Sequence, residues 1–340
     1  RIFHLIAGNG TLTVDNFSLV NTNTTATTTA VSVVAPAPAP VPSPTPTSVV
    51  TSPSPSPTPA PTTSTTKALW GAYVGWQEQN LADFETRVGK TADLRAVFVH
   101  WGNESQFPMY LAPYVRDKGK TLVIFWEATD YNVASTEQPR FNYDSIIRGD
   151  WDNYFRSFAA SAKTYNAPVI LIPFSEMNGD WFTVSGTKNG NSAAKHNAAY
   201  RHVREFFRTA TNVQFGWAPN NGSVPDVAGN QIADYYPGDL YVDVVGVDGF
   251  NFGGTQWETF SQVFDKALLQ LSTYKKPIYL FSFASQADTR KAAWIRDAIS
   301  VQIPKHTEIK GWIWFNEQKE RNWLVWSDQT ALDAFKAAIK

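Results

Sequence analysis

The chain has 340 residues, a net charge of −1 and a pI near 6.6. This balance gives no electrostatic reason to expect nucleic acid or an anionic membrane as a partner, so a neutral ligand is favoured. The absence of cysteine excludes disulfides, thiolate nucleophiles and cysteine metal sites. The 13 Trp, 13 Tyr and 22 Phe include flat rings on which a sugar can stack, although a large core accounts for half or more of them.

Residues 1–20 predict two short alternating strands around an Asn-Gly turn. About 20 residues are too few for a stable domain. Residues 10–20 resemble the last strand of a β-sandwich carbohydrate-binding module, so we interpret residues 1–20 as the remnant of such a module. A loose N-terminal hairpin is the alternative.

Residues 21–66 contain no charged side chain and are dominated by Pro, Thr, Ser, Ala and Val. Such a segment buries too little apolar surface to offset its ordering entropy, so we expect a disordered, polyproline-like linker. Linkers of this kind join secreted modules, which favours a secreted, extracellular protein. No basic-then-apolar leader precedes Arg1, so we expect that an export signal has been removed or that the chain is a fragment.

Residues 67–340 alternate short apolar runs with helical stretches and predict a single (β/α)₈ TIM barrel. The helical stretches include residues 151–165, 194–209, 260–274 and 290–301. Near-continuous apolar strands separated by helices are typical of a parallel sheet covered on both faces, and eight such units favour a closed barrel over an open doubly wound sheet. The expected strands are residues 71–75, 96–100, 122–126, 169–174, 213–217, 242–247, 278–281 and 312–315.

Barrel enzymes carry their reacting groups at the carboxyl ends of the strands, so the polar and aromatic residues that follow each run are the candidate site. A site without a Lys or Arg cluster suits an uncharged, polyhydroxylated substrate and predicts neither a cofactor nor a metal. His196 and His202 lie six residues apart on a helix expected to face solvent, which argues against metal ligation. The candidate residues are His100, Trp101, Trp126, Glu127, Ser175, Glu176, Asn178, Asp248, Phe250, Asn251, Ser282 and Asn316.

Glu176 has the best context for a proton donor. Glycosidic bond cleavage needs one carboxyl group to protonate the leaving oxygen and a second to act as nucleophile or as base for water. Phe174, Met177 and Trp181 can desolvate Glu176 and raise its pKa, so that it holds a proton near neutrality. The alternative is a Glu that caps a helix or pairs with an Arg.

Four stretches resemble glycoside hydrolase family 26, which contains β-mannanases, mixed-linkage β-glucanases (lichenases) and β-1,3-xylanases. They are Glu-Met-Asn-Gly-Asp-Trp-Phe at 176–182, Gly-Trp-Ala-Pro-Asn at 216–220, the segment 235–251, and Lys-Ala-Ala-Trp-Ile at 291–295. The resemblance covers residues 67–340 and implies a barrel with its acid/base after strand four and its nucleophile on strand seven, acting with retention. It assigns the acid/base to Glu176, with Asn178, Gly179 and Trp181 as motif neighbours.

Two positions depart from the family pattern. Ser175 stands where the family often has His, and Ser282 stands where the nucleophilic Glu is expected. A serine hydroxyl without an adjacent base is a poor nucleophile toward an anomeric carbon. We favour a deliberate Glu-to-Ser exchange, made to trap substrate or to build a glycosynthase, over natural loss that leaves a sugar-binding pseudoenzyme. Replacement of the nucleophile by Glu127, Asp248 or Glu317 is a third possibility.

The substrate class follows from weaker signals. Residues 247–251 and the Phe-Ala-Ser stretch after Ser282 resemble the lichenase branch, so we expect an endo-β-glycanase acting on mixed-linkage β-1,3-1,4-glucan, with β-mannan as the alternative. A non-catalytic carbohydrate-binding protein and an adhesive surface protein remain open. We expect Trp314 to form the floor under the sugar next to the cut, or to belong to the core, and the same alternatives hold for Trp101, Trp126 and Trp181. A monomer is expected.

Overall fold

The computed structural model describes residues 67–340. The predicted strand remnant at residues 1–20 and the predicted linker at residues 21–66 lie outside the described residues. The bounds of the predicted catalytic domain, 67–340, stay a prediction.

Eight parallel strands form a closed barrel in the order of the sequence, so the predicted (β/α)₈ fold is confirmed. Each strand pairs with the next, and β8 closes the barrel on β1 with Tyr73 opposite Phe315. The strands are β1 (Leu69–Tyr73), β2 (Leu94–His100), β3 (Thr121–Glu127), β4 (Val169–Pro173), β5 (Val213–Trp217), β6 (Val244–Asn251), β7 (Ile278–Ser285) and β8 (Ile309–Phe315).

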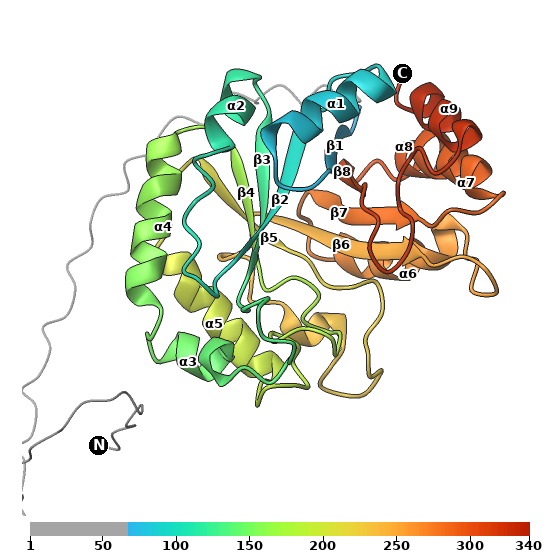
Figure 1. The fold of residues 1–340 in the computed structure, drawn as a ribbon. Coiled ribbons are helices and arrows are strands. Elements are labelled where there is room, and N and C mark those ends of the chain that lie inside the picture. Colours follow the sequence, from blue (N-terminus) through green and yellow to red (C-terminus); the bar gives the residue numbers. More distant parts are fainter. Residues whose placement is uncertain (1–66) are drawn as a thin grey trace, which may run out of the picture. The chain divides into compact units, whose positions relative to one another are not determined.

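Helices surround the strands on the outside of the barrel (Figure 1). The connection from β5 to β6 differs, because it holds the 3₁₀ turn η2 (Ile232–Tyr235) and no α-helix. Two further short turns are η1 (Pro139–Phe141) and the π-helical η3 (Ala298–Gln302). The α-helices are α1 (Glu78–Val88), α2 (Ala112–Asp117), α3 (Tyr143–Ile147), α4 (Asp152–Tyr165), α5 (Ala193–Glu205), α6 (Phe260–Ser272), α7 (Lys291–Asp297), α8 (Ile303–Lys305) and α9 (Gln329–Ala338).

Helix α6 shows how the sequence specifies one of these covering helices. Thr259 and Gln262 form a capping box, in which each side chain bonds the other residue's backbone N–H and satisfies donors left free at the helix start. Buried apolar residues then recur three and four positions apart, which places them on one face. That face packs on the barrel through Phe260, Val263, Phe264, Ala267, Leu268 and Leu271.

Aromatic rings fill the barrel interior toward its carboxyl end. Phe98 and Phe125 stack with ring centroids 4.5 Å apart, and Tyr73 stacks on Phe315 at 5.1 Å. Burial of one such ring stabilises the fold by about 1.5–3 kcal/mol. A β-carbon at Gly246 would lie 2.2 Å from Phe281, so only glycine leaves room for that ring between the strands.

A β-bulge in β7 determines which way the end of this strand points. Val247 pairs with Leu280, whereas the next residue of β6, Asp248, pairs with Ser282. Strand β7 therefore holds one residue more than β6 at Phe281. Bulges of this kind re-aim side chains and are frequent beside active sites.

Candidate active site at the carboxyl ends of the strands

Glu127 and Asp248 point into the mouth of the barrel. Successive side chains of a strand point to opposite faces. Trp126 stacks on Phe158 of α4 at 4.5 Å, on the outside, which puts Glu127 inside. A β-carbon at Gly249 would meet Phe264 of α6, which likewise puts Asp248 inside.

Ser282 joins them from β7. Its neighbour Phe283 packs outward against Trp294 of α7, with ring centroids 6.1 Å apart. Ser282 therefore faces the mouth, beside its ladder partner Asp248. The structure thus brings together the ends of β3, β6 and β7 that the sequence predicted to meet.

Glu176 follows β4 in an irregular segment. Phe174 and Glu176 both have left-handed backbone conformations, with φ of 59° and 53°. Such a conformation costs a non-glycine residue roughly 1–2 kcal/mol and is concentrated at functional sites. The Glu176 N–H donates to Ala218 O at 2.8 Å, and Trp181 Nε1 donates to Glu176 Oε2 at 2.7 Å.

The carboxyl groups of the mouth hold their protons unusually well. Burial raises the pKa of Glu176 to about 7, opposed by the Trp181 hydrogen bond and by the charge of Lys319. Burial also raises the pKa of Glu127 to about 8. For Asp248, burial and then the charges of Glu176 and Glu127 raise the pKa well above its ordinary value.

Among the described residues, Glu176 does not form an ion pair with an Arg, which was the alternative that the sequence left open. Within residues 67–340, no Lys, Arg or His nitrogen lies within 4.0 Å of the Glu176 carboxyl group. Its one side-chain partner is the indole N–H of Trp181. A carboxyl group with a raised pKa and a single neutral donor can deliver a proton near neutrality.

Asn178 links the loop after β4 to the loop after β5. Its side-chain oxygen accepts the Asn220 N–H at 2.8 Å, and its amide nitrogen donates to Asn220 O at 3.1 Å. Asn178 is fully buried, so it positions the loop that carries Glu176 and does not offer its amide to a ligand. Asn251 acts in a similar way, because it bonds Ser285 Oγ and the backbone N–H groups of Gly253 and Glu258.

Three of the predicted sugar-stacking tryptophans belong to the core. Trp101, Trp126 and Trp314 have no exposed surface. Trp314 points outward, where its ring lies 5.5 Å from Phe335 of α9. The expectation that it forms the floor of the sugar site is therefore corrected, since strand alternation gives the inward position to Phe315. Trp181, at 38% exposure, keeps a free surface beside Glu176.

The remaining predicted residues lie around the mouth in different degrees of exposure. His100 ends β2, with its ring 4.9 Å from that of Tyr131, and its buried Nδ1 has no hydrogen-bond partner among residues 67–340. Phe250 packs on Phe315 at 5.7 Å. Asn316 is buried, and its side-chain oxygen accepts the Val325 N–H. Ser175 and Glu127 line a cavity of about 10 Å³, which corresponds to about one water molecule.

Several exposed aromatic residues after the strands were not singled out from the sequence. Trp76 follows β1 and Tyr131 follows β3, each 50% exposed, and Phe252 follows β6 at 39%. Exposed rings beside a site of carboxyl groups suit stacking on sugar. Their position directly after a strand was the available signal, but 48 aromatic residues in the chain, 13 Trp, 13 Tyr and 22 Phe, obscured it.

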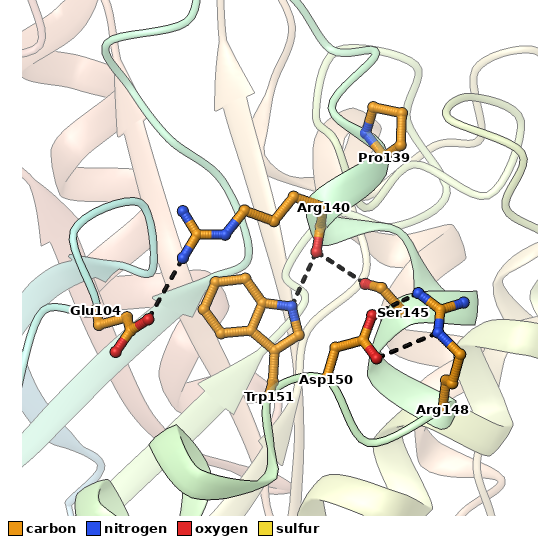
Figure 2. Close-up of a pocket in the computed structure, with 7 residues that line it drawn as sticks. All are labelled: Glu104, Pro139, Arg140, Ser145, Arg148, Asp150 and Trp151. Carbon is orange, nitrogen blue, oxygen red and sulfur yellow. Dashed lines mark hydrogen bonds and ion pairs between the residues drawn. The ribbon is translucent and has the colours of Figure 1, made fainter. Parts of the chain in front are cut away.

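A separate pocket of about 330 Å³ lies away from these acids (Figure 2). Figure 2 shows the Arg140 guanidinium over the Trp151 ring, 4.8 Å from its centroid, and beside Glu104. Arg148 pairs with Asp150 in the lining of the same pocket. Its charges are mutually paired, and none of the carboxyl groups of the mouth lines it, so it is not the candidate catalytic site.

The structure also bears on the histidines. Within residues 67–340, no group of three His, Cys, Asp or Glu side chains could hold a metal ion. The expectation that the helix exposes His196 was wrong, because His196 is fully buried, with Tyr143 and Tyr235 each 5.5 Å away between ring centroids. This burial lowers the pKa of His196 to about 4.

The fold and the site together define a (β/α)₈ barrel protein with a carboxyl-rich mouth at the strand ends. A family model described as "Glycosyl hydrolase family 26" matches residues 68–272. The chain belongs to this family, as the sequence motifs indicated. None of the helices described for residues 67–340 is both long and apolar enough to cross a membrane.

Comparison with curated proteins finds two relatives with different named activities. Endoglucanase H of Acetivibrio thermocellus is 32% identical over 281 residues, which are 79% of this chain and 30% of that protein. Mannan endo-1,4-beta-mannosidase of Bifidobacterium adolescentis is 31% identical over 90 residues, 25% of this chain and 8% of that protein. The chain thus spans less than a third of the length of either relative.

Solved structures share the fold. A family 26 β-mannanase from Bacteroides ovatus matches with a TM-score of 0.63 and 17% identity, over 81% of this chain and 88% of that chain. A double mutant of the Cellulomonas fimi endo-β-1,4-mannanase matches with a TM-score of 0.62 and 16% identity, over 80% and 70% of the two chains. At such identities the likeness concerns the fold and leaves the substrate open.

Proposed function

We propose that residues 67–340 are the sugar-binding barrel of an endo-β-glycanase for mixed-linkage β-1,3-1,4-glucan, with Glu176 as its proton donor and with hydrolysis impaired at Ser282. The observation that carries the proposal is the state of Glu176. Its carboxyl group has a pKa raised to about 7 and is held by the Trp181 indole in a mouth that also contains Ser282. A general acid is most effective when its pKa lies near the working pH.

Ser282 limits the reaction. Its hydroxyl group is shorter than a glutamate side chain and has no histidine or lysine among its strand neighbours to remove its proton. Without activation, a hydroxyl group attacks an anomeric carbon poorly. The proposal therefore gives this form slow hydrolysis and retained binding. A side chain shorter than glutamate at position 282 leaves room for the fluoride of an α-glycosyl fluoride, which makes glycoside synthesis the matching use of an engineered form.

Substrate choice rests on the comparison with relatives. The match to Endoglucanase H extends over 79% of this chain, whereas the match to the mannosidase extends over 25%. Both support a β-linked, uncharged polysaccharide, and the longer match favours glucan over mannan. The exposed rings of Trp76, Trp181 and Phe252 supply apolar surface for such a chain of sugars.

The setting follows from the substrate and from the chain's composition. Insoluble or polymeric plant glucan is met outside the cell, and a Pro/Thr/Ser-rich stretch at residues 21–66 is typical of secreted modular enzymes. We therefore propose an extracellular, monomeric barrel that acts without a cofactor. The net charge of −1 is consistent with an uncharged partner.

The test is to restore the missing carboxylate. Ser282→Glu is expected to raise hydrolysis of barley β-glucan and lichenan by roughly a thousandfold or more, since loss of a nucleophile costs up to about 10⁶-fold in a well-studied protease. Ser282→Gln is the matched control, because it has the same size and no negative charge, and it is expected to give no gain. Reducing-sugar release on β-glucan, lichenan and galactomannan measures the outcome.

The substrates and a binding measurement separate the alternatives. If Ser282→Glu raised hydrolysis of galactomannan alone, the proposed substrate would be mannan and not glucan. If calorimetry showed undiminished affinity for glucan while Ser282→Glu gave no increase in hydrolysis, the protein would be a sugar-binding pseudoenzyme. No binding and no gain on any substrate would refute the proposal and leave a structural or adhesive role.

A further inference from the structure

Asp248 and Glu127 are the two buried acids of the mouth that the proposed function leaves unused, and each has a carboxyl oxygen without a partner among the described residues. Asp248 is 2% exposed, and strand alternation at Gly249 directs its side chain into the mouth. Its Oδ1 is buried and has no hydrogen-bond partner within the described residues. Leaving a buried carboxyl oxygen unpaired is costly, and such atoms are expected to have a role toward a ligand or water.

Asp248 also stands beside the position that lacks a carboxylate. It is the ladder partner of Ser282, and the bulge at Phe281 turns both side chains to the same face. Neighbouring strands lie about 4.8 Å apart. The Asp248 carboxyl group therefore borders the space that a longer side chain at position 282 would occupy.

The backbone fixes Asp248 and Glu176 on either side of β5. The Glu176 N–H donates to Ala218 O at 2.8 Å, and the Asp248 N–H donates to the next carbonyl, Pro219 O, at 3.0 Å. Both side chains reach inward from strands that are not neighbours, so their carboxyl groups can stand further apart than one strand spacing of about 4.8 Å. Inverting glycosidases hold their carboxyl groups about 6.5–9.5 Å apart to admit a water molecule, whereas retaining ones need about 5–5.5 Å.

We propose that Asp248 is a catalytic base of this chain and that, with serine at position 282, it supports a slow hydrolysis with inversion of configuration. The proposal rests on the proposed function, because Glu176 must act as proton donor. A water molecule beside Ser282 gives a proton to Asp248 as its oxygen bonds the anomeric carbon. The glycosidic C–O bond breaks in the same step, and Glu176 transfers its proton to the departing oxygen.

The groups facing Asp248 explain why the reaction is slow. Burial, the charge of Glu176 and the charge of Glu127 raise the pKa of Asp248, while the Ser282 backbone N–H lowers it. A base with a raised pKa is strong once ionised. A carboxyl group with a raised pKa is ionised in fewer molecules, however, than an ordinary aspartate at the same pH. We therefore expect slow turnover, because the ionised form of Asp248 is a strong base but is present in only part of the molecules.

Glu127 is the competing base, and the strand order argues against it. It ends β3, which is four strands from β7 in either direction around the closed barrel, whereas Asp248 lies on β6, directly beside β7. A base for inversion must approach the sugar from the face opposite to the acid. Asp248, the ladder partner of the position of the missing nucleophile, meets that requirement better.

The experiment reads the configuration of the product. An aryl β-glycoside of a glucan oligosaccharide with a dinitrophenolate leaving group is used, because such a group departs without a proton and isolates the base from Glu176. The unaltered chain, in stoichiometric amount and in the cold, where anomers interconvert slowly, is expected to release the α-anomer in the proton NMR spectrum. Ser282→Glu is expected to release the β-anomer.

Substitution of the base completes the test. Asp248→Asn is expected to slow the reaction of the unaltered chain by about 10²-fold or more and to slow the Ser282→Glu form much less. Asp333→Asn, an exposed acid on α9, is the matched control for loss of one charge. Calorimetric affinity for an oligosaccharide verifies that each variant is folded.

Three results would overturn the proposal: the β-anomer from the unaltered chain, a larger loss with Glu127→Gln than with Asp248→Asn, or binding without any hydrolysis. Of these, the last leaves the proposed glucan site standing, because Ser282→Glu can still restore retention. Loss of binding altogether would refute the proposed function as well.

Discussion

The indole of Trp181 controls the proton on Glu176. Its N–H donates to Glu176 Oε2 at 2.7 Å and favours the charged form, so it lowers a pKa that burial has raised. Trp181→Phe keeps an aromatic ring and removes the donor. The pKa of Glu176 is then expected to rise above about 7, and the proton donor stays protonated to higher pH.

This change is measured by carbon NMR titration of side-chain carboxyl groups, with the Glu176 signal identified from its loss in Glu176→Gln. Trp76→Phe is the matched control, because its indole bonds the Tyr73 hydroxyl and no carboxylate. If the titration midpoint of Glu176 were unchanged or lower in Trp181→Phe, the hydrogen bond from Trp181 to Glu176 would be contradicted.

Lys291 holds two elements together from a buried position. It begins α7 with no exposed surface, and its Nζ donates to Leu324 O at 2.7 Å in the loop between β8 and α9. Burial lowers its pKa from 10.5 to about 7. Because the unfolded chain keeps this proton to higher pH than the folded chain does, the free energy of unfolding rises with pH between about 7 and 10, by up to about 1.4 kcal/mol per pH unit.

Lys291→Met removes this titration, so the free energy of unfolding is expected to depend less on pH over that interval. Urea unfolding of both proteins at several pH values measures the two slopes. Lys266→Met, on the exposed side of α6, is the control and is expected to keep the original slope. Equal slopes in all three proteins would show that Lys291 is not the group responsible.

The sequence predicted the positions of the strands, because their apolar pattern is a direct consequence of burial, but it did not predict which way single side chains point or where a strand is irregular. Parallel strands covered by helices are apolar along their whole length, which is why all eight were located. The same property hides which side each residue faces, so the sequence left Trp314 between the sugar site and the core, and the structure packs it on α9. The β7 bulge inserts one residue through local pairing with β6 and β8, which no periodicity reveals.

The sequence also predicted which strand-end residues gather at the candidate site, but it did not predict which of them contact other loops of the protein. Barrel topology places every strand end at one mouth, so Glu127, Glu176, Asp248 and Ser282 were expected together. Asn178 was expected to contact substrate, but its partners lie 42 residues further along the chain, in the loop after β5. Which polar residue binds a ligand and which one joins two loops depends on such distant partners.

For the whole molecule, the proposed function predicts that substrate binding stabilises the barrel even though turnover is slow. A ligand at 100 times its Kd adds about 2.7 kcal/mol to the free energy of unfolding, because it binds the folded state alone. A barrel of this size gains about 2 °C in Tm per kcal/mol. A mixed-linkage glucan tetrasaccharide is therefore expected to raise Tm by about 5 °C.

Tryptophan fluorescence during heating follows this transition, since most indoles of the barrel are buried. A mannan tetrasaccharide at the same concentration is the matched ligand control, because it differs in the sugar and not in charge or length. A rise with glucan and none with mannan supports glucan as the substrate, and the reverse supports mannan. Equal rises would mean that the mouth recognises β-linked sugars without distinguishing them, since stacking on exposed rings depends on the apolar face of a sugar more than on one hydroxyl group.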